Sequence, residues 1–272
     1  MMYTAAHLAD MGCQVGVFAN DPAGGLPQVR QMSSLGEAMG MFSNIIMGIP
    51  FSKDGNTLFA PLCAQEIFAD EILAHVQPHH RIAVGMPGGF LTSCAKRGAV
   101  CIDYNSLEEF ALYNAVPTAE AVLALLISNL PTTISDSSIL ILGYGRIGKA
   151  LAGMLKGLGA NVTATARKAT DFAMMDIAKI NSLVTGSYSG LNRFDAVVNT
   201  IPHATADEGF YVQLGEGSLI IDASSYPGHM DGDCAKRHGV TLIGAFGLPG
   251  KTAPATSGKI ISKIAIDIFS KL

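Results

Sequence analysis

Three glycines spaced as G-x-G-x-x-G lie near the middle of the sequence, in the segment GYGRIG (143–148). They follow the apolar run SILIL and precede RIGKALAGMLKGLG, which has the pattern of a helix. Between a strand and a helix, such glycines allow a tight turn, a close approach of the backbone to a pyrophosphate and close packing of the helix. The spacing therefore predicts a dinucleotide site, with a glycine-rich turn that binds nothing as the alternative. Its predicted residues are Gly143, Tyr144, Gly145, Arg146, Ile147 and Gly148.

The next expected strand, NVTATA (161–166), ends in two cations where an acid is usual. NAD sites commonly carry Asp or Glu about 20 residues beyond the glycine motif to bond the ribose 2′-hydroxyl. Here no carboxylate occurs before Asp171, and Arg167 and Lys168 instead favour a 2′-phosphate. We therefore predict NADP (NADPH) as the cofactor, with solvated cations beside an NAD site as the alternative. The predicted contacts are Thr165, Ala166, Arg167 and Lys168.

Polar segments also follow the later strands of this half. Ligands of open α/β sheets lie outside the carboxyl ends of the strands. Those ends carry NTIPH (199–203), DASSYPG (222–228) and GLPGK (247–251). We expect the nicotinamide near them, in contact with Thr200, Ile201 and Pro202.

Composition limits the class of protein and of partner. The chain of 272 residues is 49% hydrophobic with 30 glycines, which is typical of a well-buried α/β protein. A net charge of -4 without a basic block argues against nucleic acid. The densest apolar run, AVLALLI (121–127), is too short to span a bilayer, and no signal-peptide pattern begins the chain. Five cysteines without a Cys-x-x-Cys pair predict reduced thiols and no metal. We therefore expect a cytoplasmic protein that binds a small ligand.

Short β-branched runs alternate with helical patterns along the whole chain, which indicates βα units and parallel sheets. The expected strands are 14–20, 44–50, 81–86 and 99–104 in the first half, and 138–143, 161–166, 194–202, 218–224 and 240–246 in the second. The predicted fold class is α/β, with two Rossmann-like doubly wound parallel-sheet domains, each an open sheet. A long helical segment, 106–133, joins them and is expected to be interrupted at Pro117.

Three segments follow from this pattern. We expect residues 1–113 to form an N-terminal flavodoxin/Rossmann-like domain on the substrate side and residues 114–255 to form the NADP-binding Rossmann domain. Residues 256–272 are expected to form a C-terminal helix that packs across the junction or against the first domain.

Tyr3 to Met11 has the pattern of the helix that follows the first strand of such a domain, yet no strand precedes it. We favour the loss of roughly 15 to 20 residues, the length of a strand and its connection. A sheet that starts with a helix is the alternative.

Five segments in order make the chain resemble the family of dipicolinate synthase A subunits from sporulating bacteria. They are NAVPTAE (114–120), ILGYGRIGKALA, VVNTIP, LIIDASSYPGH and GLPGKTAPATSG (247–258). The resemblance implies an NADP-dependent oxidoreductase subunit that forms dipicolinate (pyridine-2,6-dicarboxylate) from a dihydrodipicolinate-level intermediate by hydride transfer. It also implies that the partner is a flavodoxin-like B subunit, and a homo-oligomer is possible.

Such a dicarboxylate substrate requires cations and hydrogen-bond donors. Lys251 is the first candidate, because adjacent glycines and Thr252 leave backbone amides free to help; a surface lysine is the alternative. Hydroxyls of Ser224 and Ser225 could bond substrate or only cap their loop. Thr118, like Asn114, could reach the substrate from the domain junction, while Glu120 could simply cap its helix. The candidates for a proton acceptor are His203 and Tyr226, whereas His79 and His80 are expected to be solvated in a turn.

Two other functions remain open at this stage. A D-2-hydroxyacid dehydrogenase shares two domains and a mid-chain glycine motif, but it needs a catalytic Arg after the strand LIIDASS and a catalytic His near the end of the cofactor domain. In this sequence Ser224 or Ser225 occupies the region of the Arg, and GLPGKTAP occupies the region of the His. The other alternative is a non-catalytic NADP-binding subunit that serves a partner enzyme.

Overall fold

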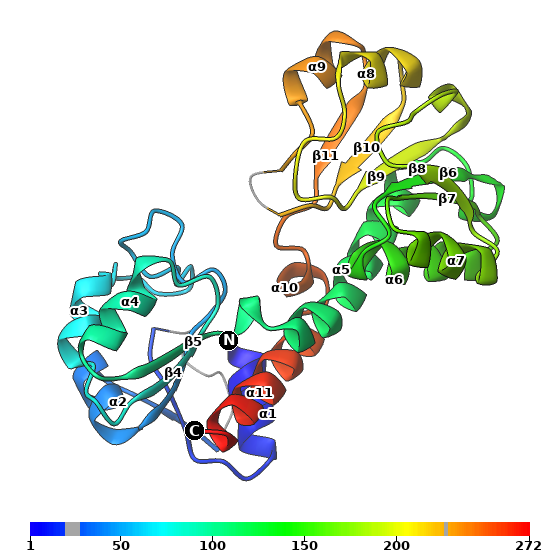
Figure 1. Ribbon diagram of the computed structural model, residues 1–272. Helices are drawn as coiled ribbons and strands as arrows, with labels where there is room; N and C mark the ends of the chain where they lie inside the picture. Colours follow the sequence, from blue (N-terminus) through cyan, green and yellow to red (C-terminus); the bar gives the residue numbers. More distant parts are fainter. Residues whose placement is uncertain (20–27, 226–227) are drawn as a thin grey trace. The chain divides into compact units, whose positions relative to one another are not determined.

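The computed structural model describes residues 1–19, 28–225 and 228–272. Tyr226, one of the predicted proton acceptors, lies outside the described residues. The chain divides into two compact units, Met1–Asn114 together with Pro254–Leu272, and Ala115–Ala253. The second unit is one continuous segment, whereas the first is built from both ends of the chain (Figure 1).

The first unit contains two small parallel sheets among its described residues, with strand orders β1-β2 and β3-β4-β5. Its elements are α1 (Met2–Asp10), β1 (Val15–Val17), β2 (Val29–Gln31), α2 (Leu35–Met41), β3 (Asn44–Ile46), α3 (Ala69–His75), β4 (Arg81–Val84), α4 (Gly89–Lys96), β5 (Val100–Asp103) and α11 (Pro254–Ser270). A single open sheet was expected. Among the described residues, β1 instead pairs with the unexpected strand β2, and both strands pack their valines against Ala5 and Ala9 of α1, in a core of their own.

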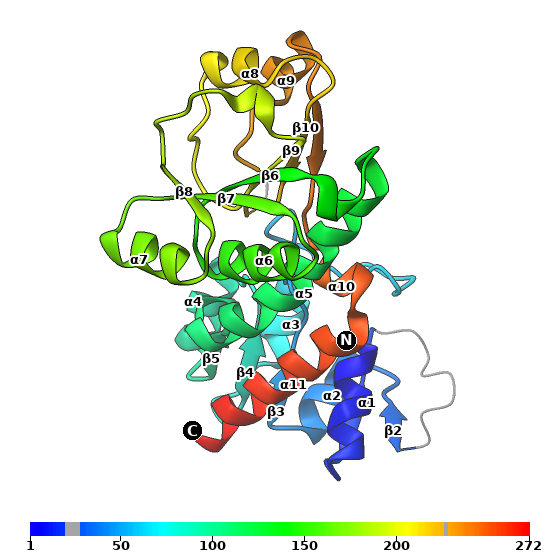
Figure 2. The same ribbon diagram turned by 90° about the vertical axis from the view of Figure 1, so that its right-hand side faces the viewer.

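Alternate residues of β4 point into two different cores of this unit. Ile82 and Val84 belong to the cluster formed with α3 and α4, while Ala83 belongs to the cluster formed with α11. Helix α11 also packs on α1, as Figure 2 shows. The two helices approach so closely that a Cβ added to Gly258 would lie 2.6 Å from Tyr3 Cβ. The C-terminal helix is therefore part of the core of the first unit.

His80 was expected in solvent but is buried, with 1% of its surface exposed. Its Nδ1 accepts a hydrogen bond from the Gln77 amide at 2.9 Å, and Nε2 lies 2.9 Å from the carbonyl oxygen of Met39. Both ring nitrogens are thus satisfied inside the protein, which makes His80 a structural residue.

The second unit is a six-stranded parallel sheet with strand order β11-β10-β9-β6-β7-β8. Its elements are β6 (Ser138–Leu142), α6 (Arg146–Gly157), β7 (Asn161–Ala166), α7 (Ala169–Ile177), β8 (Asn181–Val184), β9 (Ala196–Asn199), α8 (Glu208–Leu214), β10 (Leu219–Asp222), α9 (Gly232–Arg237), β11 (Thr241–Gly244) and α10 (Pro249–Thr252). This order, which runs outward in both directions from β6, is that of a doubly wound dinucleotide-binding domain. The predicted α/β fold class is confirmed.

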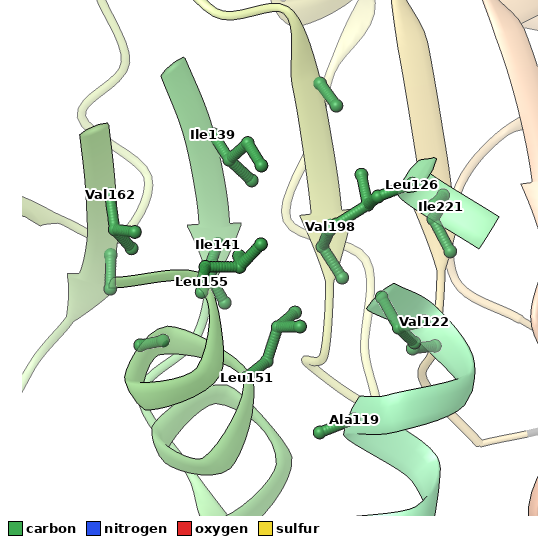
Figure 3. Close-up of a cluster of buried hydrophobic side chains, with 14 of the residues drawn as sticks. Ala119, Val122, Leu126, Ile139, Ile141, Leu151, Leu155, Val162, Val198 and Ile221 are labelled. Carbon is green, nitrogen blue, oxygen red and sulfur yellow. The ribbon is translucent and has the colours of Figure 1, made fainter. Parts of the chain in front are cut away.

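Helices cover both faces of this sheet, so alternate residues of β6 enter two different cores. Ile139 and Ile141 belong to the cluster on the side of helices α5 (Glu108–Asn129) and α6, which also contains Val122 and Leu151 (Figure 3). Leu140 and Leu142 face α8 and α9. The complete burial of the last four residues of β6, Ile139 to Leu142, fixes the position of the glycine turn that follows it.

Helix α5 is continuous through Pro117, so the predicted interruption was wrong. Proline removes one amide donor, which leaves the carbonyl of Tyr113 without its helical partner. Tyr113 is exposed, so solvent can satisfy that carbonyl. By length and apolar composition α5 is also a helix that could cross a membrane. However, Ala119, Val122 and Leu126 are completely buried in the core of the second unit, which makes α5 a core helix.

Candidate functional site

The three glycines after β6 meet three different physical requirements. Gly143 has φ +94°, and an added Cβ would lie 2.8 Å from Ile201 Cγ1. A Cβ on Gly148, in the first turn of α6, would lie 2.2 Å from the carbonyl oxygen of Gly143. At Gly145 an added Cβ would meet no described atom within 4 Å. The turn is therefore tight, closely packed against its helix and open where a phosphate would approach, which fits a dinucleotide.

Threonine hydroxyls hold this turn in place. Thr165 Oγ1, at the end of β7, accepts a hydrogen bond from the Gly143 amide at 2.9 Å and is itself contacted by Thr185 Oγ1 at 3.2 Å. Thr200 Oγ1 donates to the Leu142 carbonyl at 2.9 Å. Thr165 is fully buried and Ala166 is 5% exposed. Thr165, one of the predicted cofactor contacts, is thus a buried residue whose side chain bonds the backbone of the glycine turn.

The side chains of the turn differ in exposure. Tyr144 is buried, and this burial raises the pKa of its phenol. Arg146 is exposed and Ile147 is half-buried at the start of α6. Ile201 is buried against Gly143, whereas Pro202 is exposed.

Two exposed cations follow β7, as the sequence predicts. Arg167 and Lys168 make no side-chain hydrogen bond or ion pair within the described part of the chain, and Lys168 directly precedes α7. The first carboxylate after them, Asp171, pairs with Lys149 of α6, with 3.0 Å between Oδ1 and Nζ. The carboxylate is therefore held by a cation of the neighbouring helix, while the two cations at the strand end remain available to a ligand.

A network of polar side chains joins the carboxyl ends of β9 and β10; we call Asn199, Asp222, Ser224 and His229 the polar network. Asp222 Oδ1 accepts hydrogen bonds from Asn199 Nδ2 at 3.0 Å and from Ser224 Oγ at 2.6 Å. Its Oδ2 accepts from the amide of His229 at 2.7 Å and from that of Met230 at 3.0 Å. Ser224 Oγ also lies 3.0 Å from His229 Nδ1.

The charge of Asp222 is stabilised by these donors. Burial alone raises the pKa of the Asp222 carboxyl, but the hydrogen bonds from the Ser224 hydroxyl and from backbone amides outweigh it, so that the pKa lies below its ordinary value. Gly228 adds to the packing, since a Cβ there would lie 2.7 Å from Phe246 Cζ and 3.0 Å from Asp222 Oδ2. Asp222 is thus a buried carboxylate that fixes the loop after β10.

The remaining predicted residues have varied surroundings. Ser224 is buried with its hydroxyl engaged in the polar network, while Ser225 and His203 are exposed. Thr118 is buried in α5, with 7% of its surface exposed. The structure therefore brings Ser224 together with the ends of β9 and β10, and it leaves Ser225 and His203 on the surface of their loops.

Lys251 lies in α10, and its side chain is exposed without a partner among the described residues. The expectation of a free amide was wrong for Thr252. The amides of Lys251 and Thr252 donate to the Leu248 carbonyl at 2.8 and 2.9 Å, because this short segment closes into a helical turn. Any substrate contact of Lys251 must come from its ammonium group.

Sequence reasoning missed His229 and Asp222 as members of the site. Both occur in the segment LIIDASSYPGH, and an aspartate at a strand end followed by a serine and a histidine was the available signal.

The sequence prediction also missed a group of possible metal ligands, Glu208, Cys234 and His238, whose ligand atoms lie within 4.8 Å of one another. Glu208 Oε1 is also 3.7 Å from Arg237 and 3.2 Å from His238, so we interpret this group as an ion-pair cluster.

Comparison with known proteins connects these features to two families. Residues 1–105 match the family described as the N-terminal domain of the A subunit of dipicolinate synthase. Residues 127–213 match the D-isomer specific 2-hydroxyacid dehydrogenase, NAD binding domain. The chain is 30% identical over 166 residues to the dipicolinate synthase A subunit of Bacillus subtilis (strain 168), an alignment that covers 61% of this chain and 56% of that protein.

Solved structures share the fold over nearly the full length. The dipicolinate synthase A subunit from Bacillus halodurans superimposes with a TM-score of 0.88 at 22% identity, covering 99% of this chain and 94% of that one. The transhydrogenase from Sinorhizobium meliloti gives a TM-score of 0.70 at 13% identity, covering 100% of this chain and 88% of that one. The predicted resemblance is confirmed. The NAD-binding domain indicates a nicotinamide dinucleotide cofactor and supports a role as an oxidoreductase.

Proposed function

Because the chain resembles the A subunit of dipicolinate synthase in sequence and in fold, we propose that it is an NADP-dependent oxidoreductase subunit that forms dipicolinate from a dihydropyridine dicarboxylate. The observation that carries the proposal is the open glycine turn at Gly145 combined with the unpaired cations Arg167 and Lys168. A 2′-phosphate would find two positive charges and no competing carboxylate at the end of β7.

In this proposal the residues of the chain bind and orient both ligands. Backbone amides of the glycine turn, at the start of α6, hold the pyrophosphate. The nicotinamide, when bound, accepts a hydride, and the loss of a hydride and a proton leaves the substrate ring aromatic. The ammonium group of Lys251 pairs with a substrate carboxylate. Ser225 and His203, exposed at the carboxyl ends of β10 and β9, are further candidates for contacts with the substrate.

The partner and the compartment follow from the same resemblance. We propose that the chain works in the cytoplasm with a flavodoxin-like B subunit, and that turnover requires the complex. Assays with and without this flavodoxin-like partner separate the proposal from its alternatives. NADP binding without turnover under either condition would favour a non-catalytic subunit. Oxidation of D-2-hydroxyacids would favour a dehydrogenase of the family that matches residues 127–213.

The cofactor preference is tested by exchanging the two cations. In the double variant Arg167→Asp, Lys168→Ser the dissociation constant for NADPH should rise at least about tenfold, equivalent to about 1.4 kcal/mol, while that for NADH falls. Fluorescence titration of both dinucleotides measures this change. Lys236→Ser, which removes an exposed lysine of α9, should leave both constants unchanged. A wild type that binds NADH at least as tightly as NADPH would contradict the assignment of NADP.

A further inference from the structure

His229 is held by both a side-chain and a backbone contact. Its amide donates to Asp222 Oδ2 at 2.7 Å, and its Nδ1 lies 3.0 Å from Ser224 Oγ. The Ser224 hydroxyl in turn donates to Asp222 Oδ1 at 2.6 Å. Both the backbone and the ring of His229 are thus fixed to the same buried carboxylate.

This arrangement selects one tautomer of the imidazole. A hydroxyl has one proton, and that of Ser224 is used in the hydrogen bond to Asp222. Ser224 Oγ can therefore only accept from the ring, so His229 carries its proton on Nδ1. The lone pair is then on Nε2, which has no hydrogen-bond partner within the described ranges and belongs to a half-buried residue. A histidine in this state is an acceptor of protons.

The polar network also places His229 at the same sheet edge as the dinucleotide turn. Thr200 Oγ1 bonds the carbonyl of Leu142, immediately before that turn. Asn199, its neighbour at the end of β9, donates to Asp222 at the end of β10. These contacts run without interruption from the glycine turn to the histidine loop, inside the second unit. Ligands of doubly wound sheets occupy this edge.

We propose that His229 is the proton acceptor of the oxidation, positioned by Ser224 and Asp222. This inference rests on the proposed function. One ring carbon of the dihydropyridine loses hydrogen as a hydride to the oxidised nicotinamide dinucleotide. The adjacent carbon loses hydrogen as a proton to Nε2 of His229, and the electron pair of that C–H bond enters the aromatic ring. The products are dipicolinate, the reduced dinucleotide and an imidazolium ion, which returns its proton to solvent.

Within the described residues, titratable groups near His229 include Asp222 of β10 and Asp231 ahead of α9. Tyr211 of α8, whose hydroxyl accepts from the Asp231 amide at 2.8 Å, and Cys234 of α9 lie beside them. Burial raises the pKa of Tyr211, so its phenol is neutral while Asp222 is charged. A carboxylate reached through Ser224 stabilises the imidazolium that forms, which is the role expected of an orienting acid.

The test compares variants in the complete two-subunit enzyme. His229→Gln should lower kcat for dihydropyridine oxidation by about 10²–10⁴-fold, the usual contribution of a general base, and should remove the loss of activity that accompanies imidazole protonation at low pH. NADPH affinity, measured by fluorescence, should not change. His238→Gln is the matched control, since His238 is a half-buried histidine that meets an acid, Glu208. It should keep both the rate and the pH profile of the wild type.

A second readout needs neither substrate nor cofactor. A long-range ¹H–¹⁵N spectrum of the free protein should show neutral His229 with its proton on Nδ1, and Ser224→Ala should convert it to a mixture of tautomers. A His229→Gln enzyme with wild-type turnover, or a wild-type His229 protonated on Nε2, would overturn the role of His229 alone. A wild-type complex that binds NADP but does not oxidise the dihydropyridine would instead overturn the proposed function.

Discussion

At the scale of single residues, Asp222 shows how one side chain connects the fold to the site. Its two oxygens accept from the ends of two strands and from the loop that carries His229. With 2% of its surface exposed, the carboxylate could not be retained without these donors, because a buried charge is costly unless hydrogen bonds satisfy it. Its loss would leave several donors unpaired in the same place.

Asp222→Asn should therefore destabilise the protein in a manner that depends on pH. The folded pKa of Asp222 lies below its ordinary value of 3.8. Its contribution is thus fully present above that value and is lost as the pH falls through the folded pKa. Urea unfolding should show a loss of about 1–3 kcal/mol at pH 7, and the difference from wild type should shrink below about pH 4. Asp233→Asn, at an exposed position of α9, should change little. A difference that stays constant with pH would contradict this account.

At the scale of elements, the contact between α6 and the turn before it can be tested with two glycines of the same helix. An alanine Cβ at Gly148 would lie 2.2 Å from the Gly143 carbonyl oxygen, whereas one at Gly153 meets nothing within 4 Å. Gly148→Ala should abolish measurable NADPH binding and lower the melting temperature. Gly153→Ala should stabilise the helix by about 0.5–1 kcal/mol and keep NADPH affinity. Fluorescence titration and thermal melts measure both effects, and equal behaviour of the two variants would show that the close contact is not required.

The same scale explains how far the sequence predicts this structure. Strands with dense apolar runs, such as β6 and β9, were predicted because both faces of the sheet are buried. Strands β2 and β8 were missed because VRQ and NSLV have few apolar residues, and β8 lies at the sheet edge. The glycine turn follows from local spacing, so it was predictable. The role of His229 depends on a loop that folds back onto Asp222, and sequence spacing alone does not reveal such contacts.

At the scale of the whole molecule, the two units depend differently on the end of the chain. The second unit ends at Ala253, before α11 begins. The first unit needs α11, because Ile260, Ile261, Ile264 and Ile268 fill its core beside Tyr104. Each buried isoleucine contributes about 1.5–3 kcal/mol, and a whole domain is stable by only about 5–15 kcal/mol. Loss of the helix therefore removes a contribution as large as the stability of the unit.

A chain truncated after Ala253 should thus keep NADPH binding and lose the cooperative unfolding of the first unit. NADPH at 100 times its dissociation constant should stabilise the unfolding transition of the second unit by about 2.7 kcal/mol, which calorimetry can measure. In the truncated chain this transition should be the one that remains. A chain ending at Ser270 keeps all of α11 and should behave as wild type. If the chain that ends at Ala253 did not bind NADPH, the second unit could not be independent of α11, and the dinucleotide site would have to be assigned to the whole chain.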